Sequence, residues 1–258
     1  MKVAFVLYPD FTALDIVGPY EVISRWPDAD VHFLASSSGP VRTDCGLTVI
    51  PTDTPESLRD PDLIVVPGSG NPLPVLEDRV LLGWLRKAAP GCKWTASVCT
   101  GAGLYAAAGL LDGKKTSTHW GFRDVVRAYG VEVVEDRVVW EGNHISCAGV
   151  SAGIDMALTL SERVHGRDLA EALQLVIEYD PQPPFDTGSL EKADAATERR
   201  AMDVLIAAAG LTRMKVATRM GRAIVRARIA RVRRTLGGGR ASNGTNPLPS
   251  TRPEQRVS

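Results

Sequence analysis

Short apolar runs alternate with amphipathic segments along the first 190 residues of the chain. Runs that suit buried strands fall at residues 3–7, 31–35, 63–66, 131–134, 137–140 and 144–147, and another ends on Cys99. Segments with a helical pattern occupy residues 14–23, 78–89, 102–108 and 167–179, and a further helix opens within residues 148–153 and reaches residue 163. This alternation predicts an α/β fold in which a mostly parallel central sheet carries helices on both faces.

Three local signals refine this pattern. Residues 41–50 are interrupted at 44–46 by Asp-Cys-Gly, which predicts a hairpin. Pro19 suits the first turn of the helix expected at 14–23. The apolar start of the chain is broken after five apolar residues by Tyr-Pro-Asp, so it predicts a buried strand better than a signal peptide, and no apolar run has the length of a membrane span.

The composition changes after Phe185. We expect a catalytic domain at residues 1–190 and a basic extension of one or two helices at residues 191–235, followed by a disordered tail at 236–258. The formal net charge of zero hides the same division. Residues 213–258 hold 12 of the 30 Lys and Arg residues but 1 of the 30 Asp and Glu residues, leaving 18 and 29 in residues 1–212.

The basic extension permits three interpretations. Apolar residues are interleaved with its arginines, as in an amphipathic helix. Such a helix can pack on the acidic body, contact an anionic surface such as a membrane or a nucleic acid, or bind a partner protein. The segment after Phe185 is short for a domain with two helix-turn-helix motifs, and it has no tandem recognition-helix pattern.

Cys99 stands at the end of a predicted strand and directly before a predicted helix. The residues after it, Thr100, Gly101 and Ala102, leave room for a sharp strand-to-helix turn. Such a turn lifts its central side chain above a helix N-terminus, where the helix dipole and free N–H groups lower the pKa of a cysteine. On these residues alone a nucleophile and a buried structural thiol explain Cys99 equally well.

Two other chemical features fall at predicted strand ends. The run 63–66 leads directly into a glycine-rich loop with Gly68 and Gly70, whose N–H groups can point at an anion, although taken alone a plain turn explains this loop better. A short strand predicted at 116–120 ends on His119. Ligands of parallel α/β sheets bind at the carboxyl ends of the strands, so these features favour a functional Cys99.

The other cysteines, Cys45, Cys92 and Cys147, form no CxxC pair and have no zinc-site spacing, so we interpret them as structural thiols. This cysteine usage favours a reducing compartment, and we expect the protein in the cytoplasm.

Several segments together resemble the ThiJ/PfpI (DJ-1/PfpI) superfamily. They are Leu-Asp-Ile-Val-Gly-Pro at 14–19, Val-Cys-Thr-Gly-Ala at 98–102 and Thr-His-Trp at 118–120. Two more, Ala-Gly-Val-Ser-Ala-Gly-Ile-Asp at 148–155 and Glu-Tyr-Asp-Pro-Gln-Pro-Pro-Phe at 178–185, are similar to the isocyanide hydratase branch. The resemblance implies a flavodoxin-like three-layer sandwich, similar to class I glutamine amidotransferases, with a nucleophile elbow.

The resemblance also assigns roles to residues. It implies that Cys99 is the nucleophile, that Asp15 is its acidic partner and that Thr100 faces the pocket. It implies that Gly68 and Gly70 supply backbone donors, and that His119 is a pocket neighbour and not the essential base. Without the resemblance, an ordinary position at a helix start explains Asp15 better than a catalytic role does.

The implied activity is cysteine-dependent hydration of isocyanides to N-substituted formamides by a homodimer that requires neither a metal nor an organic cofactor. Two alternatives stay open. One is glyoxalase- or deglycase-like action on α-oxoaldehydes, in which a Cys99–His119 pair does the chemistry. The other is a non-catalytic redox sensor or transcription regulator in which oxidation of Cys99 is the signal.

Overall fold

The computed structural model describes residues 1–238, and the sequence pattern predicts most of its elements. A central sheet has six strands in the order β2-β1-β5-β6-β10-β9. Its strands are β1 (Lys2–Val6), β2 (Asp30–Leu34), β5 (Leu63–Val66), β6 (Trp94–Val98), β9 (Val138–Glu141) and β10 (His144–Cys147). All neighbouring pairs are parallel except β9 and β10 at one edge, which confirms a mostly parallel sheet.

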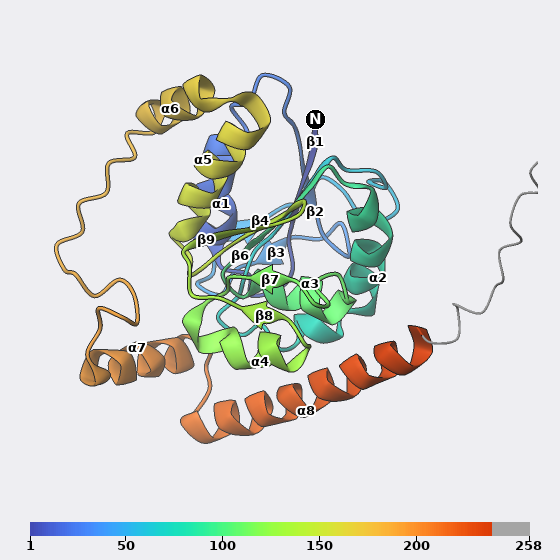
Figure 1. Ribbon diagram of the computed structural model, residues 1–258, viewed down its shortest axis with the longest axis vertical. Coiled ribbons are helices and arrows are strands. Elements are labelled where there is room, and N and C mark those ends of the chain that lie inside the picture. Colours follow the sequence, from blue (N-terminus) through green and yellow to red (C-terminus); the bar gives the residue numbers. More distant parts are fainter. Residues whose placement is uncertain (239–258) are drawn as a thin grey trace, which may run out of the picture.

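Helices cover both faces of the sheet and complete a three-layer sandwich (Figure 1). Helices α1 (Ala13–Ile23) and α5 (Ala152–His165) pack together on one face, and α6 (Arg167–Val176) packs on α5. Helices α2 (Arg79–Ala88) and α3 (Ala102–Ala108) pack on the other. All four side chains of β5 are buried, as expected for a strand covered on both faces.

The remaining elements are short. The predicted hairpin is confirmed as the antiparallel pair β3 (Val41–Arg42) and β4 (Thr48–Val49). A two-stranded parallel sheet joins β7 (Lys115–Thr116) to β8 (Glu132–Val133), and α4 (Arg123–Ala128) lies between these strands in the chain. Four 3₁₀ turns, η1 (Val75–Glu77), η2 (Ala89–Gly91), η3 (Cys99–Gly101) and η4 (Trp120–Phe122), connect larger elements.

Two local predictions are wrong. Pro19 lies inside α1, six residues after its first residue, and not in the first turn. Gly18, which has no Cβ, reduces the clash that proline imposes on the residue before it, and the Pro19 ring packs closely against Gly153. The strand expected to end on His119 stops at Thr116, and the His119 side chain instead caps η4.

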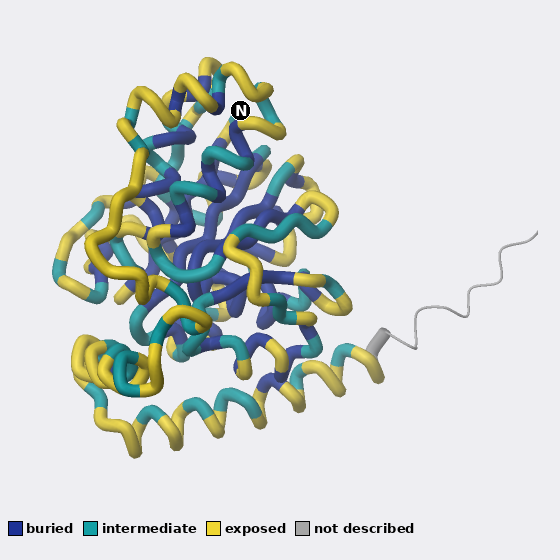
Figure 2. The backbone as a smooth tube through the Cα atoms, turned by 60° about the vertical axis from the view of Figure 1, so that its left-hand side comes forward, coloured by how far each residue is buried: buried dark blue, intermediate teal, exposed yellow. Residues whose placement is uncertain are grey.

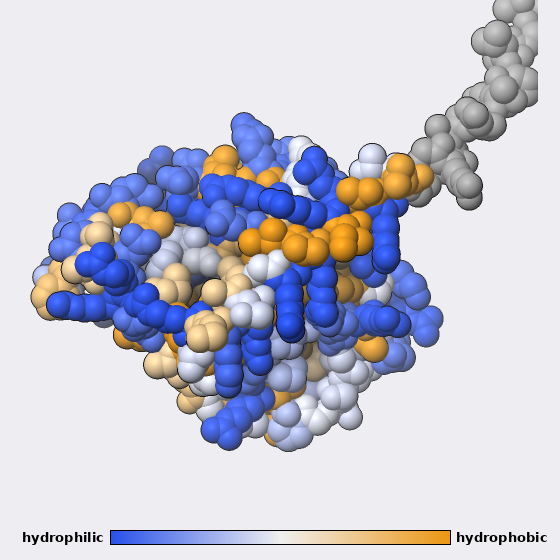
Figure 3. Space-filling view, turned by 90° about the horizontal axis from the view of Figure 1, so that it is seen from below, coloured by the Kyte–Doolittle hydropathy of each residue, from blue (hydrophilic) through white to orange (hydrophobic). Residues whose placement is uncertain are grey.

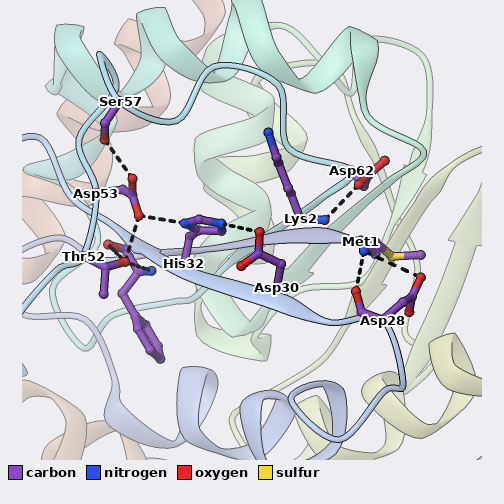
Figure 4. A network of polar contacts seen from close by, with 10 residues as sticks. Met1, Lys2, Asp28, Asp30, His32, Thr52, Asp53, Ser57 and Asp62 are labelled. Carbon is purple, nitrogen blue, oxygen red and sulfur yellow. Dashed lines mark hydrogen bonds and ion pairs between the residues drawn. The ribbon is translucent and has the colours of Figure 1, made fainter.

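Polar contacts tie the edge strand β2 to the neighbouring loops (Figure 4). His32 Nδ1 lies 2.8 Å from Asp53 and its Nε2 lies 3.2 Å from Asp30. Burial opposes protonation of His32, but the hydrogen bonds to Asp53 and Asp30 prevail and raise its pKa. This network secures β2 at the edge of the sheet, whereas Cys99 follows β6, which lies in the middle of the sheet.

The basic extension forms two helices, α7 (Ala195–Ala208) and α8 (Arg213–Gly238), below the body in Figure 1. Helix α8 ends at Gly238, three residues beyond the expected end of the extension at 235. The rest of the predicted tail, residues 239–258, lies outside the described residues. Helix α8 packs on α4 and contacts α7. No helix among residues 1–238 is long and apolar enough to cross a membrane.

Candidate active site

Cys99 sits on the sharp turn that its sequence predicts. The chain passes from β6 through η3 into α3, and Cys99 has a φ of +58°, a region that non-glycine residues seldom occupy. Its backbone N–H donates to the Ala148 carbonyl at 2.9 Å. Its carbonyl accepts from the Thr118 hydroxyl at 2.8 Å and from the His119 N–H at 3.3 Å. These bonds hold Cys99 in an unfavourable backbone conformation, as is common at functional sites.

Close backbone packing around the elbow requires glycine. A Cβ on Gly68 would lie 2.5 Å from the Thr100 nitrogen and 2.8 Å from the Cys99 Cβ. A Cβ on Gly101 would lie 2.3 Å from the Val66 carbonyl oxygen. The glycine-rich loop and the elbow therefore pack backbone against backbone, which brings the ends of β5 and β6 together.

Gly68→Ala is expected to destabilise the protein by about 1–3 kcal/mol, because the new methyl group meets backbone atoms that cannot move aside cheaply. Urea unfolding measures the effect. The matched control is Gly83→Ala in α2, where a Cβ meets no atom within 4 Å and helix propensity favours alanine by up to about 1 kcal/mol. Equal stability of the two variants would contradict the close approach at Gly68.

Asp15 reaches the elbow from the first turn of α1. Its side chain is fully buried, and its Oδ2 accepts a hydrogen bond of 2.7 Å from the Gly68 N–H. Its other oxygen, Oδ1, is buried and has no hydrogen-bond partner among the described residues, and the Cys99 thiol lies close enough to influence the pKa of this carboxyl. Burial raises the pKa of Asp15 to about 7, against the opposing effects of the hydrogen bond from Gly68 and of the nearby Cys99 thiol.

The pKa of Cys99 is raised well above its ordinary value, contrary to the prediction from the helix N-terminus. Burial is the main cause, and the negative charge of Asp15 is the second. Hydrogen bonds from the Val150 and Thr100 N–H groups favour the thiolate but are outweighed. Burial and mutual repulsion therefore oppose loss of both protons, and near pH 7 Asp15 and Cys99 keep at least one proton between them.

The raised pKa of Asp15 has a consequence for stability. A pKa of about 7 in the folded protein, against an ordinary 3.8, means that the folded state binds this proton more tightly. The contribution of Asp15 to the free energy of unfolding is therefore greatest below pH 4. As the pH rises to 7, this contribution declines by about 4 kcal/mol for a pKa shift of this size.

Asp15→Asn removes this ionisation and is expected to raise stability relative to the wild type at pH 8, but not at pH 4. The difference between the two proteins should change by up to about 4 kcal/mol between these pH values. Urea unfolding of both proteins at both pH values measures it. A difference that stays constant with pH would show that Asp15 has an ordinary pKa.

Thr100, Gly70 and His119 lie on the pocket beside Cys99, but their geometries differ. The Thr100 hydroxyl accepts from the Ser69 N–H at 2.8 Å and lies 3.3 Å from the Ser69 carbonyl, so it holds the glycine-rich loop. Gly70 lies farther along that loop, near Asp44. His119 Nδ1 accepts from the Gly121 N–H at 3.2 Å. Burial and nearby Arg123 lower the His119 pKa to about 4, which makes it a weak base.

The elbow opens into a cavity of about 470 Å³. One wall holds polar groups that include Asp10, Thr12 and Asp44, and Thr12 donates to Asp44 at 2.7 Å. Cys45 also lines this wall and is exposed, so the interpretation of Cys45 as a structural thiol is wrong, whereas Cys92 and Cys147 are buried. Asp10 and Thr12 come from the loop between β1 and α1, and Asp44 and Cys45 from the hairpin, and neither segment carries a motif that points to the pocket.

The opposite wall of the cavity comes from the C-terminal helices. Its residues are Met202, Leu205, Ile206, Ala208, Ala209, Leu211, Val216, Arg219 and Met220, and all but Arg219 are apolar. Sequence reasoning missed this wall, although the three- and four-residue spacing of apolar positions in α7 indicates a helix with one buried face. Among residues 1–238, no group of three or more His, Cys, Asp or Glu side chains could hold a metal ion.

A model of the DJ-1/PfpI family matches residues 1–163, which include the elbow and Asp15. The chain belongs to the DJ-1/PfpI family. Isonitrile hydratase of Pseudomonas putida is 41% identical over 196 residues, which cover 76% of this chain and 86% of that protein. The family resemblance and the flavodoxin-like fold drawn from the sequence are thereby confirmed.

A DJ-1/PfpI family relative of known structure also aligns over most of the chain. The crystal structure of a ThiJ/PfpI family protein from Pseudomonas syringae has a TM-score of 0.79 and 33% identity, and covers 88% of this chain and 90% of that one. An alignment over residues 1–190 alone would cover a smaller part of this chain, so the aligned region includes part of the C-terminal extension. The HTH-type transcriptional regulator CdhR of Pseudomonas aeruginosa is 32% identical over 174 residues, which cover 64% of this chain and 51% of the regulator.

Proposed function

We propose that this protein hydrates isocyanides to N-substituted formamides, with Cys99 as the nucleophile and Asp15 as the proton carrier. The burial of Cys99 and Asp15 together at the elbow, which raises the pKa of both groups, is the observation that carries this proposal. The 41% identity to an isonitrile hydratase supports the substrate class. We also propose, as the family resemblance implies, that it is a lyase that works as a cytoplasmic homodimer without a bound cofactor.

The first step joins Cys99 to the terminal carbon of the isocyanide. The thiolate attacks this electrophilic carbon, and the Asp15 carboxyl donates its proton there, which leaves a thioimidate and an ionised Asp15. A proton that can reside on either member of the pair suits this step, because the attack and the protonation occur at the same atom. The N–H groups of Val150 and Thr100 stabilise the thiolate before it attacks.

The second step uses water. Water adds across the C=N bond, placing OH on the carbon and H on the nitrogen, and Asp15 orients the water through its carboxylate. Expulsion of the Cys99 thiolate then forms the formamide carbonyl, and the hydroxyl proton returns to Asp15. The pair regains its starting state, and the sum is one isocyanide plus one water giving one formamide. Gly68 fixes the Asp15 carboxylate, and the Thr100 hydroxyl holds the adjoining loop.

The apolar wall built by α7 and α8 favours a bulky apolar substituent on the isocyanide nitrogen. Ile206→Ala is expected to lower kcat/KM for cyclohexyl isocyanide about tenfold or more, because the truncated side chain no longer packs on the substituent, and to affect methyl isocyanide much less. Steady-state kinetics with both substrates measure this. The control is Val204→Ala, on the exposed side of α7. Equal losses for both isocyanides would contradict a substituent subsite at α7.

The assay for the proposed function follows isocyanide consumption and formamide formation by chromatography. We expect the wild type to produce formamide from cyclohexyl isocyanide and no lactate from methylglyoxal, because a histidine with a pKa of about 4 is a poor base for the Cys–His mechanism. Lactate without formamide would favour the α-oxoaldehyde activity. Neither product, with selective oxidation of Cys99 by dilute peroxide, would favour a redox sensor.

A further inference from the structure

Helix α8 contacts the body through one narrow face. Ala227 at the middle of this face is fully buried, and Met220, Ala223, Ile224 and Ala230 pack against the core around it. Near the end of the helix, Arg234 forms two hydrogen bonds of 2.8 Å with Asp112. The helix is thus held on α4 by its inner face, which agrees with packing on the acidic body.

The opposite face of α8 carries an apolar stripe that nothing in the described chain covers. Its members are Val225, Ile229, Val232 and Leu236, which are 56%, 46%, 55% and 72% exposed. Their spacing of four, three and four residues places them in one line on the side away from Ala227. Figure 3 shows this face, where hydrophobic side chains form a band that leads toward the grey trace. Figure 2 shows how little of α8 is buried.

Cations flank this stripe. Helix α8 carries nine Lys and Arg residues and no Asp or Glu. Helical geometry places Arg222, Arg226 and Arg233 along one side of the stripe and Arg228 along the other. Among the described residues, only Arg213, Arg226 and Arg234 of this helix form ion pairs with carboxylates. A groove between α8 and the body adds Arg79 and Arg86 on the same side as Arg222.

We propose that α8 docks the protein on an anionic lipid surface. The helix would lie in the plane of the interface, with its stripe among the acyl chains and its arginines on lipid phosphates. A second copy of the chain fits less well, because pairing the stripes brings two all-cationic flanks together. A nucleic acid would use the arginines but has no need of an exposed apolar stripe.

The test is co-sedimentation of the full chain with vesicles, in 0.1 M salt, of phosphatidylcholine alone or with 30% phosphatidylglycerol. We expect binding to the anionic vesicles at least tenfold tighter than to the neutral ones. The double variant Ile229→Glu/Val232→Glu should weaken binding to anionic vesicles at least tenfold, because it places charge within the stripe. The matched control, Leu175→Glu/Val176→Glu, adds the same charge to an exposed apolar pair on α6 and should bind as the wild type does.

Thermal unfolding of both double variants checks that they fold. Absence of binding to anionic vesicles would overturn the proposal, as would equal losses in the two double variants. Two further results would also overturn it. One is duplex DNA binding that is tighter than vesicle binding and that the double variant Ile229→Glu/Val232→Glu leaves unchanged. The other is a dimer that this variant dissociates, without vesicle binding by the wild type.

Discussion

Cys99→Ala is expected to lower kcat/KM for isocyanide hydration by at least about 10⁴-fold, because it removes the atom that bonds to the substrate carbon. The elbow should survive the change, since the backbone of Cys99 is held by hydrogen bonds from Thr118 and to Ala148 that do not involve sulfur. Formamide formation, measured with enzyme in excess over cyclohexyl isocyanide, extends the range over which the loss can be followed.

The matched control for Cys99→Ala is Cys92→Ala. Cys92 is also buried and lies just before the same strand, but its sulfur donates to the Pro61 and Ala88 carbonyls far from the pocket. Its loss is expected to reduce stability slightly and to leave kcat/KM within about twofold of the wild type. Comparable losses of activity in the two variants would indicate damage to the fold and not removal of a nucleophile.

Asp15→Asn is expected to lower kcat by about 10³-fold, the range typical for removal of a general acid–base group. An amide can accept the hydrogen bond from Gly68, so the glycine-rich loop keeps its position. The asparagine amide cannot deliver a proton to the isocyanide carbon, and it cannot receive the hydroxyl proton when the hydrated thioimidate expels Cys99. Because the variant is also expected to be more stable than the wild type at pH 8, a large loss of kcat there cannot be attributed to unfolding.

The pH dependence of kcat/KM follows from the same pair. Below pH 7 the pair holds two protons and Cys99 cannot attack, whereas above pH 7 one proton is lost and the competent state forms. The wild type should therefore gain about tenfold per pH unit below 7 and level off above it. A rate that falls as the pH rises through 7 would show that the two-proton state is the active one.

The elbow was predictable because local sequence determines it, whereas Asp15 was assigned as its partner only through the family resemblance. Small residues around Cys99 mark a sharp turn, and short apolar runs place that turn at a strand end. The pKa of Cys99 was not predictable in this way. Its direction depends on how deeply the sulfur is buried and on its distance from Asp15, and both arise from packing between α1 and the ends of β5 and β6.

The C-terminal helices show a second limit of local patterns. Spacing of apolar residues indicates that α7 and α8 each bury a face, but it does not say against what. In the structure, Ile206 faces the cavity and Ala227 faces the body, while Val225 and Ile229 stay exposed. Two apolar faces on α8 can be told apart only when the partner of one of them is known.

Intact-protein mass spectrometry during turnover tests the central claim most directly. Wild-type protein mixed with excess cyclohexyl isocyanide and quenched with acid should carry one adduct equal to the full mass of the isocyanide, as a thioimidate requires, and digestion should place it on Cys99. The adduct should disappear as formamide accumulates and be absent from Cys99→Ala. Formamide production at the wild-type rate by Cys99→Ala would contradict the account.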